Sequence, residues 1–214
     1  MLAKNAIWNW FANNNKLLDV SNMHEYNVKL QKLLFIATGL YESLYNKTLC
    51  NVKFEAWSEG PVDNEAYAQI KNNDRPSVDY KISQEDEDFL NKINNVFGIY
   101  SSSALSTMTH DFNSWKSAYK EENGKPLPHI QMDKNEIKKD FEVLKNNFEY
   151  FGDYMNDYNP WIVNEVTVLY SKSIDFDSIY SNYSEINQIC TNEKRNNNFL
   201  IFIENNNGEL SYEV

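Results

Sequence analysis

The chain has 214 residues, of which 42% are hydrophobic, and it contains only 6 glycines and 5 prolines. A chain of this size and composition can bury a core without support from metals or disulfides, and the scarcity of glycine and proline argues against long linkers. Its net charge of −11 opposes nonspecific binding to nucleic acid, because phosphates are neutralised by Lys and Arg, and it favours a basic partner.

The N-terminal part of the sequence is dominated by helical periodicity. It predicts helices over residues 3–13 and 25–45, and the second is the stronger because its apolar residues recur at intervals of three and four. Lys29, Gln31 and Lys32 fall largely outside this apolar stripe. The stripe indicates that the second helix turns one face towards a core.

A short strand and a rigid corner follow. Residues 51–57 alternate apolar and polar side chains, which predicts a strand. Gly60 and Pro61 are expected to turn the chain and to begin a helix over residues 62–71. Pro61 would lie just inside the start of that helix, where its missing N–H costs nothing.

Further helices are predicted up to about residue 150. Ser83 and Ser101 are each expected to cap a helix, and a third helix carries Trp115. Asp133 and Glu136 have the spacing of a capping box, and the apolar residues behind them form the cleanest helical pattern in the chain.

The character of the sequence changes after about residue 150. Residues 163–170 alternate weakly and predict a strand, while 199–203 and 209–214 flank an Asn-rich turn and predict a β-hairpin. The predicted fold class is therefore mainly α. A compact multi-helix domain over residues 1–150 contains one short strand or hairpin before the Gly-Pro turn, and a small α/β appendage with a C-terminal β-hairpin covers residues 151–214.

The cysteines and the N-terminal residues predict the cellular compartment in which the protein lies. Cys50 and Cys190 match no zinc or redox spacing and are predicted to be free thiols in a reducing cytosol. The N-terminus lacks the apolar stretch of a signal peptide, and the longest apolar run, over residues 33–40, is far too short to cross a bilayer. We therefore expect a soluble cytoplasmic protein that spans no membrane.

Sequence signatures of catalysis are absent. The chain contains no phosphate-binding loop, dinucleotide-binding fingerprint, zinc-protease motif or nucleophile elbow. Its three histidines, His24, His110 and His129, lie in separate segments, so a metal site would need acids to complete it. We predict that the chain is not an enzyme and that it binds no metal or cofactor.

His110 is the best single candidate for a special role, and two interpretations stay open. In the first, Thr109 caps the next helix while His110 bonds a nearby backbone group. In the second, His110 is a general base or contact residue that Asp111 or Glu55 orients. The first interpretation is favoured, because isolated histidines are usually structural or solvated.

Trp57 is flanked by two acids, Glu55 and Glu59. Paired carboxylates can do acid–base work, but these two share a face with Trp57 only if the strand continues to the Gly-Pro corner. An exposed acid–aromatic–acid face would suit a basic partner. A buried Trp57 would simply belong to the core, and the sequence slightly favours that position.

Several of these segments, in this order, resemble the Panacea antitoxin domain, known earlier as a phage-associated domain of unknown function. The likeness covers residues 3–148, with Phe35 where the family often has Tyr, and Asp63-Asn64 in place of a hydrophobic–Pro pair. The matching residues are Lys29-Leu30-Gln31-Lys32-Leu33-Leu34, Ala56-Trp57, Gly60-Pro61-Val62 with Tyr67, and Leu105-Ser106 with Thr109-His110 and Trp115.

The resemblance implies an antitoxin that is encoded beside a toxin and neutralises it by direct protein contact. Glu55, Trp57, Tyr67, His110 and Trp115 are the candidate partner-binding residues, and the C-terminal appendage is the candidate for partner choice. A basic cognate toxin is the expected partner, nucleic acid is not expected, and homo-oligomer formation stays open. Two alternatives are a DNA-binding regulator of its own operon, which the acidity disfavours, and an adaptor that delivers a bound partner to a protease.

Overall fold

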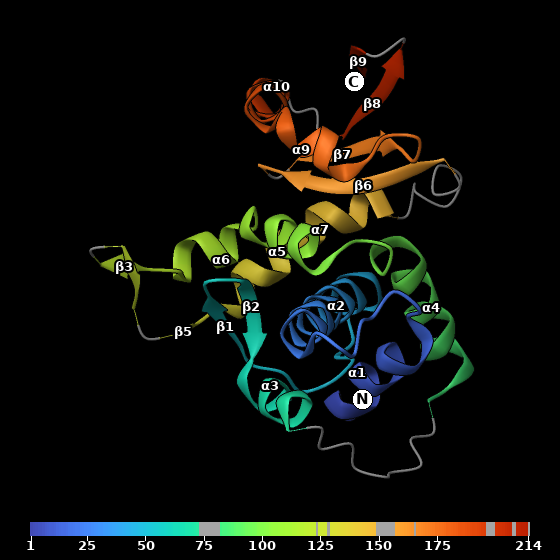
Figure 1. Cartoon of the computed structure of the whole chain (residues 1–214), viewed down its shortest axis with the longest axis vertical. Helices are drawn as coiled ribbons and strands as arrows, with labels where there is room; N and C mark the ends of the chain where they lie inside the picture. The colour runs from blue at the N-terminus through green and yellow to red at the C-terminus, as the bar shows by residue number, and fades with distance from the viewer. Residues whose placement is uncertain are drawn as a thin grey trace. The chain divides into compact units, whose positions relative to one another are not determined.

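The computed structural model describes residues 1–72, 82–122, 124–127, 129–148, 157–164, 166–195, 200–206 and 209–213. The chain divides into two units, Met1–Lys138 and Lys139–Val214. The first is mostly helical, and the second combines helices with a four-stranded sheet (Figure 1). The predicted fold class, mainly α with an α/β appendage, is confirmed.

Helix α2 (Met23–Tyr45) passes through the middle of the first unit (Figure 1). Four other helices pack against it: α1 (Lys4–Asn14), α3 (Asn64–Lys71), α4 (Gln84–Phe97) and α5 (Ser102–His110). Because several elements cover α2, every residue from Tyr26 to Tyr41 is buried. The polar residues predicted outside the apolar stripe are buried too, with exposed fractions of 4% for Lys29, 1% for Gln31 and 1% for Lys32.

The segment after α2 is a β-hairpin. Strand β1 (Phe54–Trp57) pairs antiparallel with β2 (Gly60–Asp63) around a turn at residues 58–59. The prediction that Pro61 begins a helix is therefore wrong, because Pro61 lies inside β2. It is tolerated there because β2 is an edge strand of the sheet β2-β1-β5, whose outer N–H groups need no partner in the sheet.

Asp63 caps the start of helix α3 and is the first of the two residues that stand in place of the usual hydrophobic–Pro pair. The Asp63 carboxylate accepts hydrogen bonds from the backbone N–H of Ala66 (2.9 Å) and of Lys53 (2.8 Å), and it pairs with Lys4 at 3.0 Å. Asp63 therefore caps α3 and ties it to α1 and to the entry of β1.

The predicted caps of the later helices are confirmed at three positions. Ser83 and Ser101 accept N–H groups at the starts of α4 and α5, and Asp133 does so for α7 (Lys134–Phe148). The predicted cap at Thr109 is wrong, because Thr109 lies within α5 and α6 (Asn113–Ala118) begins after Phe112. Three short strands stand between α6 and α7: β3 (Glu121–Glu122), β4 (Lys125–Pro126) and β5 (Ile130–Gln131).

The second unit contains a sheet in the order β6-β7-β8-β9, made of β6 (Tyr158–Val163), β7 (Val166–Ser171), β8 (Leu200–Asn206) and β9 (Glu209–Glu213). Helices α9 (Phe176–Ser181) and α10 (Tyr183–Arg195) connect β7 to its parallel neighbour β8. The predicted strand at residues 163–170 is confirmed as β7, although β7 begins at Val166 and Val163 ends β6, the strand that pairs with it. The predicted C-terminal hairpin is confirmed, although its turn at 207–208 lies outside the described residues.

Within the described ranges, no helix combines the length and the apolar character needed to cross a bilayer. Both cysteines are free and buried.

Candidate functional site

The β1–β2 hairpin is fixed to α2 by two polar side chains of the Lys29–Leu34 motif. The Lys32 ammonium donates a buried hydrogen bond to the Pro61 carbonyl at 3.0 Å, and Gln31 Oε1 accepts the Asp63 N–H at 2.9 Å. Polar side chains in the buried stretch of α2 lose their contact with water, so hydrogen bonds within the protein lower the cost of keeping them there. These two contacts explain why Gln31 and Lys32 interrupt an apolar helix.

Gly60 allows the hairpin to approach α2 and α5 closely. Its φ of +98° is a conformation that side chains rarely adopt. A Cβ atom on Gly60 would lie 2.5 Å from Thr109 Oγ1 and 2.8 Å from Lys32 Cε, both closer than real Cβ contacts. Lys32 of α2 and Thr109 of α5 therefore approach the hairpin most closely at Gly60.

Helices α5 and α6 hold the other side of the hairpin turn. Ser106 Oγ donates to the Glu59 carbonyl at 2.8 Å, and Trp115 Nε1 donates to the Trp57 carbonyl at 2.9 Å. The His110 ring hydrogen-bonds the backbone of Ser58. Ser106, His110 and Trp115 thus bind three consecutive residues: Trp57 at the end of β1 and the two turn residues.

The surroundings of His110 favour a structural role for its ring. Burial, together with the charge of nearby Lys32, lowers the pKa of His110 to about 4, while its bond to Ser58 acts in the opposite direction. Its ring stacks on Trp115 with centroids 4.0 Å apart, and Nε2 has no hydrogen-bond partner among the described residues. At neutral pH the ring is therefore uncharged and a weak base. The proposed orienter Glu55 is engaged elsewhere, as a partner of Trp57.

Trp57 lies in a cluster of three aromatic rings and one acid, which we call the Trp57 patch: Trp57, Tyr67, His129 and Glu55. The His129 ring stacks on Trp57 at 3.9 Å and 14°, and the Tyr67 ring lies 5.0 Å away on the α3 side. Glu55 Oε2 accepts the Trp57 indole N–H at 3.0 Å and lies 4.0 Å from His129 Nδ1. Trp57 is half-buried, which is intermediate between the exposed surface position and the buried core position considered from the sequence.

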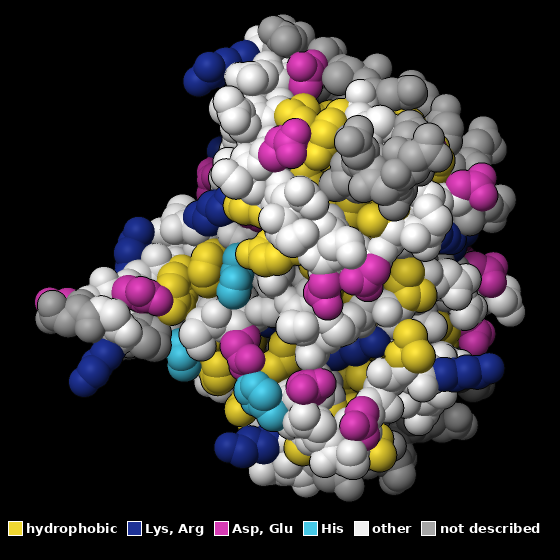
Figure 2. Space-filling model, turned by 45° about the horizontal axis from the view of Figure 1, so that its top comes forward, with side chains coloured by type: hydrophobic (Ala, Val, Ile, Leu, Met, Phe, Trp, Pro, Cys, Tyr) yellow, Lys and Arg dark blue, Asp and Glu magenta, His cyan; other side chains and the backbone are white. Residues whose placement is uncertain are grey.

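A second stack adjoins this patch. His110, Trp115 and Tyr119 lie ring on ring, with Trp115 and Tyr119 centroids 4.5 Å apart. The bond from Trp115 to the Trp57 carbonyl joins the stack to the patch. Figure 2 shows histidine, acidic and hydrophobic side chains mixed on the face beside the β3–β4 hairpin. The five predicted site residues thus fall into two neighbouring aromatic groups.

His129 was not predicted as part of the site, and no local signal marks it. It reaches Trp57 because β5 pairs with β1, with Gln131 opposite Glu55 and Ile130 opposite Ala56. A two-residue strand after a short hairpin is too brief to be recognised from alternation. Gln31 and Lys32 were noticed only as polar residues, and the contacts that explain them depend on tertiary structure.

The two acids that flank Trp57 do not share a partner. Glu55 bonds Trp57, whereas Glu59 lies 3.0 Å from His24 in an exposed pair. In the part of the chain that the structure describes, no group of three or more His, Cys, Asp or Glu side chains could hold a metal.

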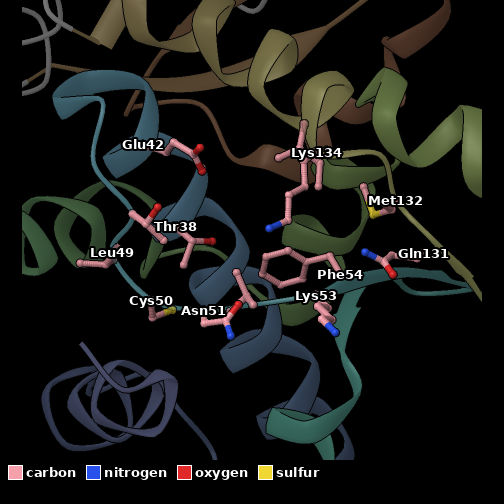
Figure 3. Close-up of a pocket in the computed structure, with 14 residues that line it drawn as sticks. Thr38, Glu42, Leu49, Cys50, Asn51, Lys53, Phe54, Gln131, Met132 and Lys134 are labelled. Carbon is pink, nitrogen blue, oxygen red and sulfur yellow. The ribbon is translucent and has the colours of Figure 1, made fainter. Parts of the chain in front are cut away.

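A cavity of about 90 Å³ lies between α2 and the segment that enters β1, with β5 at its edge (Figure 3). Cys50 lines it, and burial raises the pKa of this thiol to about 12, so it stays protonated and unreactive at neutral pH. Figure 3 shows Glu42 and Lys134 on one side of the cavity, with the Phe54 ring below Lys134 and close to Lys53 and Gln131.

Comparison with protein families adds a direct finding. Residues 30–116 match the model of the family described as antitoxin SocA-like, Panacea domain. The resemblance is confirmed for this stretch. It begins within the Lys29–Leu34 motif and ends just after Trp115, so it contains every hairpin contact described above from α2, α5 and α6. Comparisons with curated proteins and with solved structures find no match.

The matched Panacea stretch supports a toxin–antitoxin role at the level of the family. Its motif residues converge on one structural element, the β1–β2 hairpin, which they hold from two sides. Trp57, at the end of β1, and Tyr67, on α3, lie at the edge of this packed hairpin.

Proposed function

We propose that this chain is an antitoxin that neutralises a cognate toxin by direct protein–protein binding and performs no chemistry of its own. The observation that carries the proposal is the half-buried Trp57 patch on a hairpin fixed by the Panacea motif residues. Aromatic side chains at the edge of a rigid element are typical anchors of protein interfaces.

The charge around the patch favours a basic toxin. Glu55 and Glu59 lie on the hairpin, and Glu121, which accepts a hydrogen bond from the Tyr119 hydroxyl at 2.7 Å, lies beside the second aromatic stack. Together with the chain's net charge of −11, these acids would steer a basic surface towards the aromatic residues. The same acids would repel DNA phosphates, which makes an operator-binding role the weaker alternative.

The arrangement of polar groups supports a role without catalysis. His110 is committed to the Ser58 backbone, Glu55 to Trp57, and Glu59 to His24. A catalytic site needs acid, base, nucleophilic or electrophilic groups whose geometry converges on one reacting atom. The described polar side chains near Trp57 instead bond the hairpin or one another.

Co-expression with the product of the neighbouring gene tests the proposal. We expect that product to arrest growth alone, and this chain to restore growth and to co-purify with it. Trp57→Ala should weaken rescue, whereas Tyr45→Ala, which removes an exposed ring at the C-terminal end of α2, should not. A toxic neighbour with neither rescue nor a complex would refute the proposal. A shortened half-life of the neighbour would instead favour the protease adaptor.

A further inference from the structure

A small inner pocket lies behind the Trp57 patch. Its volume is about 50 Å³, and its walls include Gln31 and Lys32 from α2, Trp57 and Glu59 from the hairpin, and Tyr67 from α3. It shares His24, Val28 and Glu59 with a wider groove of about 390 Å³ that runs along α5. The pocket and the groove therefore adjoin along these three residues.

The pocket contains buried hydrogen-bond donors without acceptors. In its charged form Lys32 has three N–H donors, and its one hydrogen bond among the described residues goes to the Pro61 carbonyl. Gln31 is 1% exposed, its Oε1 is used by Asp63, and its Nε2 has no partner within the described ranges. Buried donors left without acceptors are costly, so this site favours a ligand that supplies oxygen atoms.

The size and charge of the pocket further restrict the chemical class of ligand that it can bind. A cavity of this volume holds a few water-sized groups, which excludes a nucleotide or a sugar but admits a carboxylate. Burial lowers the pKa of Lys32 to about 7, and the charge of Glu59 acts against this shift. A carboxylate beside Lys32 would favour the charged amine in the same way as Glu59.

We propose that the inner pocket binds a carboxylate group, with one oxygen held by Lys32 and the other by Gln31. The Trp57 and Tyr67 rings flank the group and shield it from water. The source that fits the pocket's place beside the patch is an Asp or Glu side chain of the bound toxin, and this part of the inference rests on the proposed function. A free small acid has the same chemistry, and the experiment separates the two.

The first arm titrates the full chain, labelled with ¹⁵N, with sodium acetate and follows the side-chain amide signals of Gln31 by NMR. We expect a saturable shift of both Gln31 Nε2 proton signals that sodium chloride at the same ionic strength does not reproduce. Absence of a saturable shift across millimolar acetate would overturn the inference.

Three variants separate the pocket from its surroundings. Gln31→Glu keeps the acceptor for Asp63 but removes the donor, and Lys32→Met removes the cation; each should weaken acetate binding about tenfold or more. Lys29→Met is the matched control, because Lys29 is also a buried α2 lysine but does not line the pocket. Equal loss in Lys29→Met and Lys32→Met would overturn the assignment. Gln31→Glu keeps the test valid if Lys32→Met does not fold.

The second arm measures the affinity of the same variants for the co-purifying neighbour. We expect Lys32→Met and Gln31→Glu to weaken that complex about tenfold, and Lys29→Met to leave it unchanged. Acetate binding with unchanged complexes would overturn the toxin as the source and identify a free acid. Because the acetate arm needs no toxin, failure of the pocket and failure of the antitoxin proposal give different results.

Discussion

Replacing Gly60 by alanine tests whether the hairpin is packed against α2 and α5 as described. The added methyl group would meet Thr109 Oγ1 at 2.5 Å and Lys32 Cε at 2.8 Å, in a backbone conformation with φ of +98°. A positive φ costs a side-chain-bearing residue about 1–2 kcal/mol. Forcing a methyl group into a packed site costs about 1–3 kcal/mol more.

We therefore expect Gly60→Ala to lower the free energy of unfolding by about 2–5 kcal/mol. Urea denaturation followed by far-UV circular dichroism measures this loss, because most of the helical signal comes from the first unit. Gly124→Ala is the matched control: Gly124 also has a positive φ, of +71°, but no atom lies within 4 Å of an added Cβ. It should lose only about 1–2 kcal/mol from backbone strain. Equal losses in the two variants would refute the close approach of Gly60 to Lys32 and Thr109.

Three further predictions concern the same residues. Trp115→Phe removes the donor to the Trp57 carbonyl and should lower the free energy of unfolding by about 1 kcal/mol in urea denaturation. An unchanged free energy of unfolding would contradict that hydrogen bond. Burial lowers the pKa of Lys32 from 10.5 to about 7, so the unfolded chain binds more protons above pH 7. Stability should therefore rise between pH 7 and 9, and the urea midpoint should rise less in Lys32→Met; an equal rise in the variant would contradict this. Burial likewise lowers the pKa of His110 from 6.5 to about 4, so stability should fall as pH drops through this window. A His110→Phe variant with an unchanged acid profile in thermal melts would argue against that assignment.

Helix positions could be predicted from the sequence because their signals are local. The three-and-four spacing in α2 and the caps at Ser83 and Ser101 depend only on neighbours along the chain. Pro61 shows the limit of such signals. A proline before a helical pattern fits the first turn of a helix, but it also fits an edge strand, and only strand pairing decides between the two.

The candidate site could be predicted in part. Trp57 and Tyr67 stand out because of their motif context, and the structure places them 5.0 Å apart. The roles of Lys32 and Gln31 could not be predicted, because amphipathic patterning assumes that a helix has one solvent face and α2 is covered on several sides. His129 depends on the pairing of β5 with β1, which brings residues far apart in sequence together.

We propose that the motif residues fix the β1–β2 hairpin so that the aromatic side chains at its edge can hold a protein partner. Hydrogen exchange of the full chain, measured with and without the co-purified product of the neighbouring gene, tests it most directly. We predict that the partner slows exchange in residues 54–63 and in α5 and α6, which bind the hairpin turn. Slowed exchange confined to other segments, with residues 54–63 unchanged, would contradict the claim.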